Sequence, residues 1–164
     1  MTPRRRIGLL GALALILSGG LVASPMTAAP AHAAYGPCNT TVHRTDGLAV
    51  YNYYVVPART DNGLSCYMQW QTGSSNAVRA LQNAILRCYG STYAARRIRD
   101  TGGADGFYGT GTVDAVRWLQ ANRLGVSADG VYGPATRQAM WWPDYWRDPG
   151  DGSVDFISCY NPPF

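Results

Sequence analysis

The second half of the chain contains three stretches in which apolar residues recur at helical spacing. The first follows Ser74 and Ser75, either of which offers a hydroxyl that can cap the amino end of a helix. Its apolar stripe consists of Ala77, Val78, Leu81, Ile85 and Cys88. Gly90 comes next, and we expect it to adopt the left-handed conformation that commonly ends a helix.

Two further helices are predicted downstream. One covers residues 112–124, with Thr112 as its cap and Gly125 as its end. The other begins at Pro134, whose fixed φ suits a first helical turn, and is ended by Pro143. The pattern therefore predicts three helices after residue 73.

Residues 34–73 have a different pattern, which predicts strands and turns. Residues 49–56 are rich in Val and Tyr and are followed by Pro57, and residues 64–71 form a second candidate strand. The sequence Asp61-Asn62-Gly63 between them is a strong turn signal. We therefore expect these two strands to form an antiparallel hairpin.

The amino terminus has the pattern of an export signal. Arg4, Arg5 and Arg6 precede an apolar stretch at residues 7–22, and Ala31-His32-Ala33 has the small residues of a cleavage site. An uncleaved membrane anchor is the alternative, but the apolar stretch is short of the roughly 20 residues that span a bilayer. We expect a signal peptide at residues 1–33, cleavage before Ala34, and a secreted protein that is extracellular or associated with the cell wall.

Composition narrows the classes of partner. Beyond the predicted signal, eleven Arg and ten Asp remain without Lys or Glu, so the net charge falls from +4 to about +1. This balance lacks the basic patch of a nucleic-acid-binding protein and the basic amphipathic helix of a membrane-surface protein. We therefore expect no nucleic-acid partner and no membrane attachment after cleavage.

Four cysteines follow the predicted signal: Cys38, Cys66, Cys88 and Cys159. An even number in an exported chain predicts two disulfides. Three pairings are possible and the sequence alone does not choose between them. We favour Cys38–Cys66 with Cys88–Cys159, because each end of the chain is then tied to the body. No C-x-x-C pair is present and His43 is the only histidine beyond the signal, so we expect no metal site and no cofactor.

Two short sequences occur twice. AVRALQ at residues 77–82 is echoed by AVRWLQ at residues 115–120, and DGFYG at residues 105–109 is echoed by DGVYG at residues 129–133. An Asp-Gly turn reverses the chain, and its Asp side chain can accept a hydrogen bond from the backbone two residues on. The repetition predicts two similar turns, each leading into a helix.

This series resembles the peptidoglycan-binding-domain-like modules of bacterial cell-wall proteins. The matching positions are Leu81-Gln82, residues 105–109, Thr112, residues 115–120, Gly125-Val126, residues 129–133 and Thr136. The resemblance covers about residues 74–142. One departure is the stretch at residues 90–103, which contains Arg96, Arg97, Arg99 and Asp100 and looks longer than the usual first connection.

The resemblance implies a mainly α fold with a three-helix core at residues 74–142. A small β-rich, disulfide-linked segment at residues 34–73 would precede it, and an aromatic tail at residues 143–164 would follow. The tail begins beside a dense aromatic run: Trp141, Trp142, Tyr145 and Trp146. We favour a lid that closes the core as the role of this run, over a face on which sugars stack.

The resemblance also implies that peptidoglycan is the partner, with a separate cell-wall hydrolase as a candidate second partner. The ligand-binding residues it suggests lie in and near the two turns: Asp105, Tyr108, Gly109, Trp118, Gln120, Asp129 and Tyr132. A purely structural role is the alternative for each class of side chain. The Asp residues can form turns, the Tyr residues can fill the core, and the glutamines can support the turns.

The residues give little support for catalysis. One histidine cannot supply a zinc set, and bridged cysteines offer no thiolate nucleophile. Asp105 and Asp129 are candidates for a glycosidase carboxylate pair, but their Asp-Gly context already explains them. We therefore predict a secreted, non-catalytic module that binds peptidoglycan. The alternatives are a protein-interaction module, such as an inhibitor or adhesin, and a small aspartate-dependent wall hydrolase.

Overall fold

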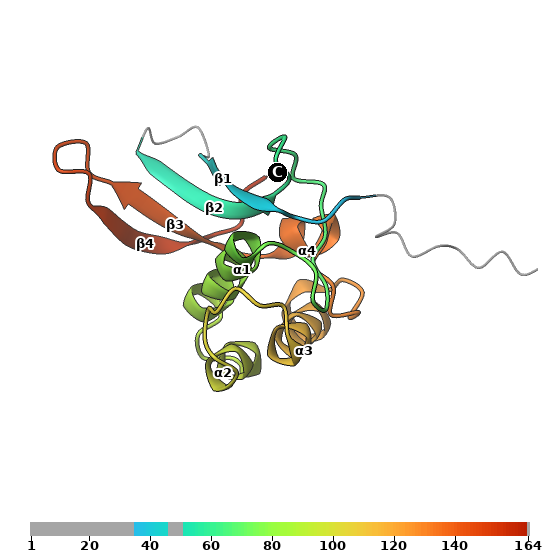
Figure 1. Ribbon diagram of the computed structural model, residues 1–164. Helices are drawn as coiled ribbons and strands as arrows, with labels where there is room; N and C mark the ends of the chain where they lie inside the picture. Colours follow the sequence, from blue (N-terminus) through green and yellow to red (C-terminus); the bar gives the residue numbers. More distant parts are fainter. Residues whose placement is uncertain (1–34, 46–50, 164) are drawn as a thin grey trace, which may run out of the picture.

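An antiparallel sheet lies beside a group of helices in the computed structural model, which describes residues 35–45 and 51–163 (Figure 1). The predicted signal peptide, its cleavage site and the first two residues of the predicted strand 49–56 lie outside these ranges. The sheet has the order β1-β2-β3-β4. Its strands are β1 (Thr40–Arg44), β2 (Asn52–Ala58), β3 (Trp142–Arg147) and β4 (Val154–Tyr160).

Four α-helices occupy the chain between β2 and β3. They are α1 (Ser75–Cys88), α2 (Tyr93–Asp100), α3 (Thr110–Leu119) and α4 (Pro134–Ala139), and a π-helical segment, η2 (Gln120–Leu124), continues α3. Within the described ranges, none of these helices has the length and apolar character needed to cross a bilayer.

The expectation of a mainly α, three-helix fold is wrong, because the described residues form a mixed α/β structure with four α-helices and a four-stranded sheet. Two strands, β3 and β4, lie in and next to the segment that was expected to be an aromatic tail. Strand β3 pairs with β2, from the other end of the chain, through Tyr53 opposite Tyr145. Such long-range pairing leaves no mark in local periodicity, which explains the error.

The predicted hairpin between residues 49–56 and 64–71 is also wrong. Strand β2 pairs with β1 on one side and with β3 on the other. Residues 64–71 form only isolated bridges, because their backbone is used elsewhere: Tyr67 bridges to Pro37 and Met68 bridges to Tyr132. The strand-like pattern of this segment therefore reflects burial against other parts of the fold.

Helix α2 replaces the long connection that was expected at residues 90–103. Thr92 caps it by accepting a hydrogen bond from the Ala95 N–H, and its buried stripe is Ala94, Ala95 and Ile98. Only three small or apolar residues mark this stripe, and arginines occupy much of the rest of the helix. The apolar signal was therefore too sparse to predict a helix.

The other helix boundaries are partly as expected. Ser74 caps α1, Pro134 occupies the first turn of α4, and Gly125 ends η2 in the left-handed conformation. By contrast, Tyr89 is the C-cap of α1 and Gly90 has no positive φ, so the predicted left-handed end is wrong.

The second and third helices differ from prediction at their ends. Gly109, rather than Thr112, is the N-cap of α3, and Thr112 is buried inside that helix. Helix α4 ends at Ala139, and Pro143 lies in β3 rather than ending a helix.

Trp142 lies in the core where the helices meet the sheet. It is fully buried, its indole Nε1 donates to the Arg137 carbonyl at 3.2 Å, and its ring meets Tyr132 edge to face at 6.2 Å. The neighbouring Trp141 is 53% exposed. Of the aromatic run at residues 141–146, Trp142 therefore closes the core, as a lid residue would.

Two disulfides join the sheet and its flanking segments to the rest of the fold, and they have the pairing that we favoured. Cys38–Cys66 links the start of the described chain to residues 64–71, and Cys88–Cys159 links the end of α1 to β4. Strand β4 is an edge strand whose residues are mostly exposed, so the second disulfide is a main tie between this strand and the helices.

We predict that the double substitution Cys88→Ser/Cys159→Ser lowers the free energy of unfolding by about 4 kcal/mol, because the disulfide closes a long loop. The Cys38–Cys66 disulfide closes a shorter loop, with a sequence separation of 28 rather than 71, so the Cys38→Ser/Cys66→Ser variant should lose about 3.5 kcal/mol. Urea unfolding of both variants and of the oxidised parent gives these values. A loss below about 1 kcal/mol in the first variant would show that pairing with β3 alone holds β4.

Candidate binding site at the repeated turns

The first repeated turn, residues 105–109, is held by the buried side chain of Gln82 from α1. Its Nε2 lies 2.8 Å from the Asp105 carboxylate, 3.1 Å from the Phe107 carbonyl and 3.0 Å from the Thr112 hydroxyl. Its Oε1 accepts a hydrogen bond from the Gly106 N–H at 2.8 Å. One carboxamide thus fixes the turn and the start of α3 together.

The second repeated turn, residues 129–133, has the same arrangement around Gln120. Its Nε2 lies 2.9 Å from the Asp129 carboxylate, 2.9 Å from the Val131 carbonyl and 3.0 Å from the Thr136 hydroxyl. The Gly130 N–H donates to its Oε1 at 2.8 Å. The sequence repeat therefore produces the same set of glutamine hydrogen bonds at both turns.

The glycine that follows each Asp is required by the backbone. Gly106 has φ +83° and Gly130 has φ +75°, in the left-handed region that favours glycine. A Cβ on Gly106 would lie 2.7 Å from the Ser75 carbonyl oxygen, and one on Gly130 would lie 2.9 Å from a Val113 methyl group. These contacts explain why the Asp-Gly pair recurs.

The tyrosines of the two turns are buried in the core. Tyr108 is 1% exposed and Tyr132 is fully buried, and burial raises the pKa of both phenols above the ordinary value. The Tyr108 hydroxyl donates to the Gly130 carbonyl at 3.0 Å, which links the first turn to the second. The Tyr132 hydroxyl has no hydrogen-bond partner among the described residues. Both rings therefore have packing roles in this structure.

A segment from the first half of the chain lies along both turns. The Met68 N–H donates to the Tyr132 carbonyl at 2.9 Å, and the Tyr132 N–H donates back to Met68 at 2.8 Å. The Gln71 N–H donates to the Tyr108 carbonyl at 3.0 Å. This pairing places Trp70 beside the first turn.

Two hollows open beside the turns, at equivalent positions of the repeat. The first-turn hollow has a volume of about 170 Å³, and its walls include Trp70, Asp105, Phe107, Gly109 and Thr110. The second-turn hollow has a volume of about 490 Å³, and its walls include Tyr35, Ser127, Asp129, Val131, Pro134 and Ala135. Gln82 and Gln120 lie in the first and second hollow respectively. The fold thus presents two related surfaces.

The sequence-predicted ligand residues divide between these hollows and the core. Asp105 and Gly109 line the first hollow, and Gln120 and Asp129 line the second. Trp118 lines neither and packs against Tyr93 of α2, with ring centroids 6.1 Å apart. Tyr108 and Tyr132 lie in the core. Ligand contact by any of the seven residues stays a prediction.

The structure adds three aromatic side chains that sequence reasoning missed. Trp70 is 49% exposed and Phe107 is 52% exposed at the first hollow, and Tyr35 is 37% exposed at the second. Phe107 occupies the variable position of its turn, which could have drawn attention to it. Trp70 and Tyr35 reach the hollows only through tertiary pairing, so no local signal pointed to them.

The hollows combine turn-forming aspartates with exposed aromatic rings. Within the part of the chain that the structure describes, no group of three or more His, Cys, Asp or Glu side chains could hold a metal ion. Asp105 and Asp129 each accept a hydrogen bond from a turn N–H at 2.8 Å, as turn-forming aspartates do. Exposed rings beside carboxylates and hydroxyls are suited to contacts with sugars or peptides.

Two comparisons with known proteins each found a match to part of the chain. Residues 74–140 match the family model described as "Putative peptidoglycan binding domain". Over 67 residues the chain is 40% identical to N-acetylmuramoyl-L-alanine amidase CwlL of Bacillus licheniformis. That match covers 41% of this chain and 16% of the amidase, so the chain spans only a small part of the length of that relative. No solved structure matches the chain.

The two buried tyrosines provide a matched pair for testing the packing roles. We expect Tyr108→Phe to lower the free energy of unfolding by about 1 kcal/mol, because it leaves the buried Gly130 carbonyl without this donor. Tyr132→Phe removes a hydroxyl without a partner, so we expect a change within about 0.5 kcal/mol. Equal losses in the two variants, measured by urea unfolding, would contradict the assignment.

Proposed function

Because residues 74–140 match the model of a peptidoglycan binding domain, we propose that this protein is a secreted, non-catalytic module that holds onto the cell wall. The two hollows beside the repeated turns are the binding surface in this proposal. The observation that carries it is the placement of exposed aromatic rings, from outside the matched segment, against the walls of the turns that define that segment.

The first-turn hollow supplies an aromatic platform. Trp70 and Phe107 each leave about half of their surface open to solvent, although large rings are normally buried where the fold permits. The exposed Asp105 carboxylate lies in the same wall. An amino sugar of the glycan strand suits this combination, since its apolar face can stack on a ring and its hydroxyl and amide hydrogens can be donated to the carboxylate.

The second-turn hollow is larger and more apolar. Its volume of about 490 Å³ lies within the roughly 300–1,000 Å³ of ligand pockets in proteins. Val131, Pro134 and Ala135 line it together with the Ser127 hydroxyl. A short stem peptide rich in alanine methyl groups suits such a surface, so we assign glycan to the first hollow and stem peptide to the second.

Secretion and a partner hydrolase belong to the same proposal. Two disulfides suit an oxidising compartment outside the cytoplasm, and the amino-terminal pattern suits export. The similar segment of the Bacillus licheniformis relative is a small part of an amidase chain. We propose by analogy that this module works alongside a separate wall hydrolase, which it would help to hold at its substrate.

The first test is co-sedimentation of the purified protein with insoluble cell wall, stripped of anionic polymers, at about 0.5 M salt, where surface electrostatics are largely screened. We expect Trp70→Ala and Phe107→Ala each to weaken retention about tenfold, because each removes part of the aromatic platform. Trp141→Ala is the matched control, since Trp141 is 53% exposed and lines neither hollow. Equal retention of all three variants would overturn the assignment of the first hollow.

The second hollow is tested by filling it. Ala135 is exposed at the start of α4, so Ala135→Arg should fold normally and should reduce wall retention at least tenfold by obstructing the hollow. Gln138→Arg adds the same charge to an exposed position of α4 outside the hollow and should leave retention unchanged. Retention of both variants at the parental level would exclude this hollow from the binding surface.

A further inference from the structure

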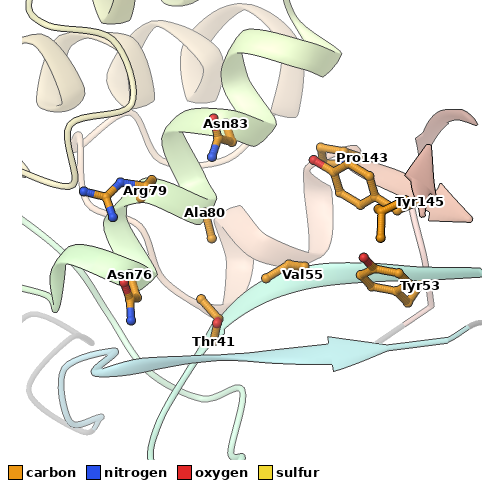
Figure 2. A pocket seen from close by; sticks show the side chains of 10 residues that line it. Thr41, Tyr53, Val55, Asn76, Arg79, Ala80, Asn83, Pro143 and Tyr145 are labelled. Atoms are coloured by element: carbon orange, nitrogen blue, oxygen red, sulfur yellow. The ribbon is translucent and has the colours of Figure 1, made fainter. Parts of the chain in front are cut away.

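A third opening lies between α1 and the sheet (Figure 2). Its volume is about 300 Å³, at the lower end of the range of ligand pockets. Helix α1 contributes Asn76, Arg79, Ala80 and Asn83, and the sheet contributes Tyr53 and Tyr145 with smaller side chains around them. We call this opening the α1–sheet cleft.

The cleft exists because the face of α1 that lines it has few large apolar side chains. The large buried residues of α1, including Leu81 and Ile85, belong to the hydrophobic core. The stripe made by Asn76, Ala80 and Asn83 has the same helical spacing but only one small apolar member. Ala80 therefore leaves a gap over the sheet that a larger side chain would fill.

Two tyrosines form one end of the cleft. The rings of Tyr53 and Tyr145 have centroids 5.8 Å apart and are tilted by 31°. The guanidinium of Arg147 lies 5.6 Å from the Tyr53 ring centroid, and that of Arg87 lies 5.6 Å from the Tyr145 ring centroid. The His43 ring stacks on the Tyr53 ring, with centroids 4.7 Å apart. Tyr145 is partly exposed, at an end of the cleft that is rimmed by positive charge.

The helical wall supplies uncommitted hydrogen-bonding groups. Among the described residues, the side-chain carboxamides of Asn76 and Asn83 have no hydrogen-bond partner. Each carboxamide can donate to and accept from an amide group of a ligand at the same time. Arg79 donates to the Ala104 and Asp105 carbonyls and still has further N–H groups. No carboxylate from the described part of the chain lines the cleft.

We propose that the α1–sheet cleft binds a sugar that carries both an acetamido group and a free carboxylate. The asparagine carboxamides would pair with the acetamido group, the partly exposed Tyr145 ring would pack against the sugar, and the arginines would attract the carboxylate. Within the proposed cell-wall function, on which this inference rests, such a sugar occurs in glycan from which the stem peptide has been removed. The cleft would then bind cell wall from which stem peptides have already been removed.

The sheet geometry favours a sugar over an extended peptide. On its sheet side the cleft is lined mainly by β2 and β3, which are the interior strands and already pair with neighbours on both sides. An extended peptide is usually held by main-chain hydrogen bonds to a free strand edge. The cleft offers side-chain groups instead, which suit the hydroxyls and acetamido group of a sugar.

The test is calorimetric titration of the disulfide-bonded full chain with the disaccharide N-acetylglucosaminyl-N-acetylmuramic acid, whose lactyl carboxylate is free. We expect saturable binding at least tenfold tighter than that of chitobiose, which has the acetamido groups without a carboxylate. Muramyl dipeptide, in which a peptide blocks the lactyl carboxylate, should also bind at least tenfold more weakly than the disaccharide.

Three variants locate this binding. Asn83→Ala removes a carboxamide and Ala80→Leu fills the gap, and we expect each to weaken disaccharide binding at least tenfold. Gln138→Ala, an exposed polar side chain of α4 outside the cleft, should leave it unchanged. Thermal unfolding of all three checks that the fold is intact.

The outcomes separate this inference from the proposed function. Loss of disaccharide binding in Ala80→Leu with wall retention preserved supports a distinct second site. Unchanged affinity in both Asn83→Ala and Ala80→Leu overturns the cleft, even if wall retention still depends on Trp70. Equal binding of chitobiose overturns the recognition of the carboxylate. Preferential binding of muramyl dipeptide overturns the requirement for a free lactyl carboxylate on the sugar.

Discussion

The structure depends on one interaction made twice: a buried glutamine carboxamide that holds an Asp-Gly turn to the next helix. Gln82 and Gln120 each satisfy the turn backbone, the Asp carboxylate and a buried threonine hydroxyl at the same time. Buried polar groups are costly unless they are paired, so each part of this network requires the others. The two turns then determine where Tyr108 and Tyr132 enter the core and where α3 and α4 begin.

This network gives the repeated Asp and Gln residues a structural role in the turns. Asp105, Gln120 and Asp129 line the hollows, but their side chains also form hydrogen bonds that hold the turns. Variants at these positions would alter stability and binding together. The side chains most open to a ligand at the first turn are Trp70, which tertiary pairing brings there, and Phe107, at the variable position of the turn itself. A binding role is therefore best examined at the rim of each hollow.

The sheet joins segments from both ends of the described chain and forms one wall of the α1–sheet cleft. Strands β1 and β2 precede the helices, β3 and β4 follow them, and two disulfides tie these flanking segments to the rest of the fold. The segment at residues 66–72 pairs with both turns, so the flanking parts shape the hollows as well. The α1–sheet cleft exists only because this added sheet meets a sparse face of α1.

The sequence by itself determined the features that depend on neighbouring residues. Helix α1 and its Ser74 cap, the start of α4 at Pro134 and the two Asp-Gly turns follow from local periodicity, capping and backbone freedom. Tertiary structure alone decided the sheet, because the pairing of Tyr53 with Tyr145 joins segments that are far apart in the chain. It also decided that Tyr108 and Tyr132 are buried whereas Trp70 and Phe107 are exposed. The physical reason is that burial of a ring depends on which distant backbone packs over it, and local sequence does not encode that partner.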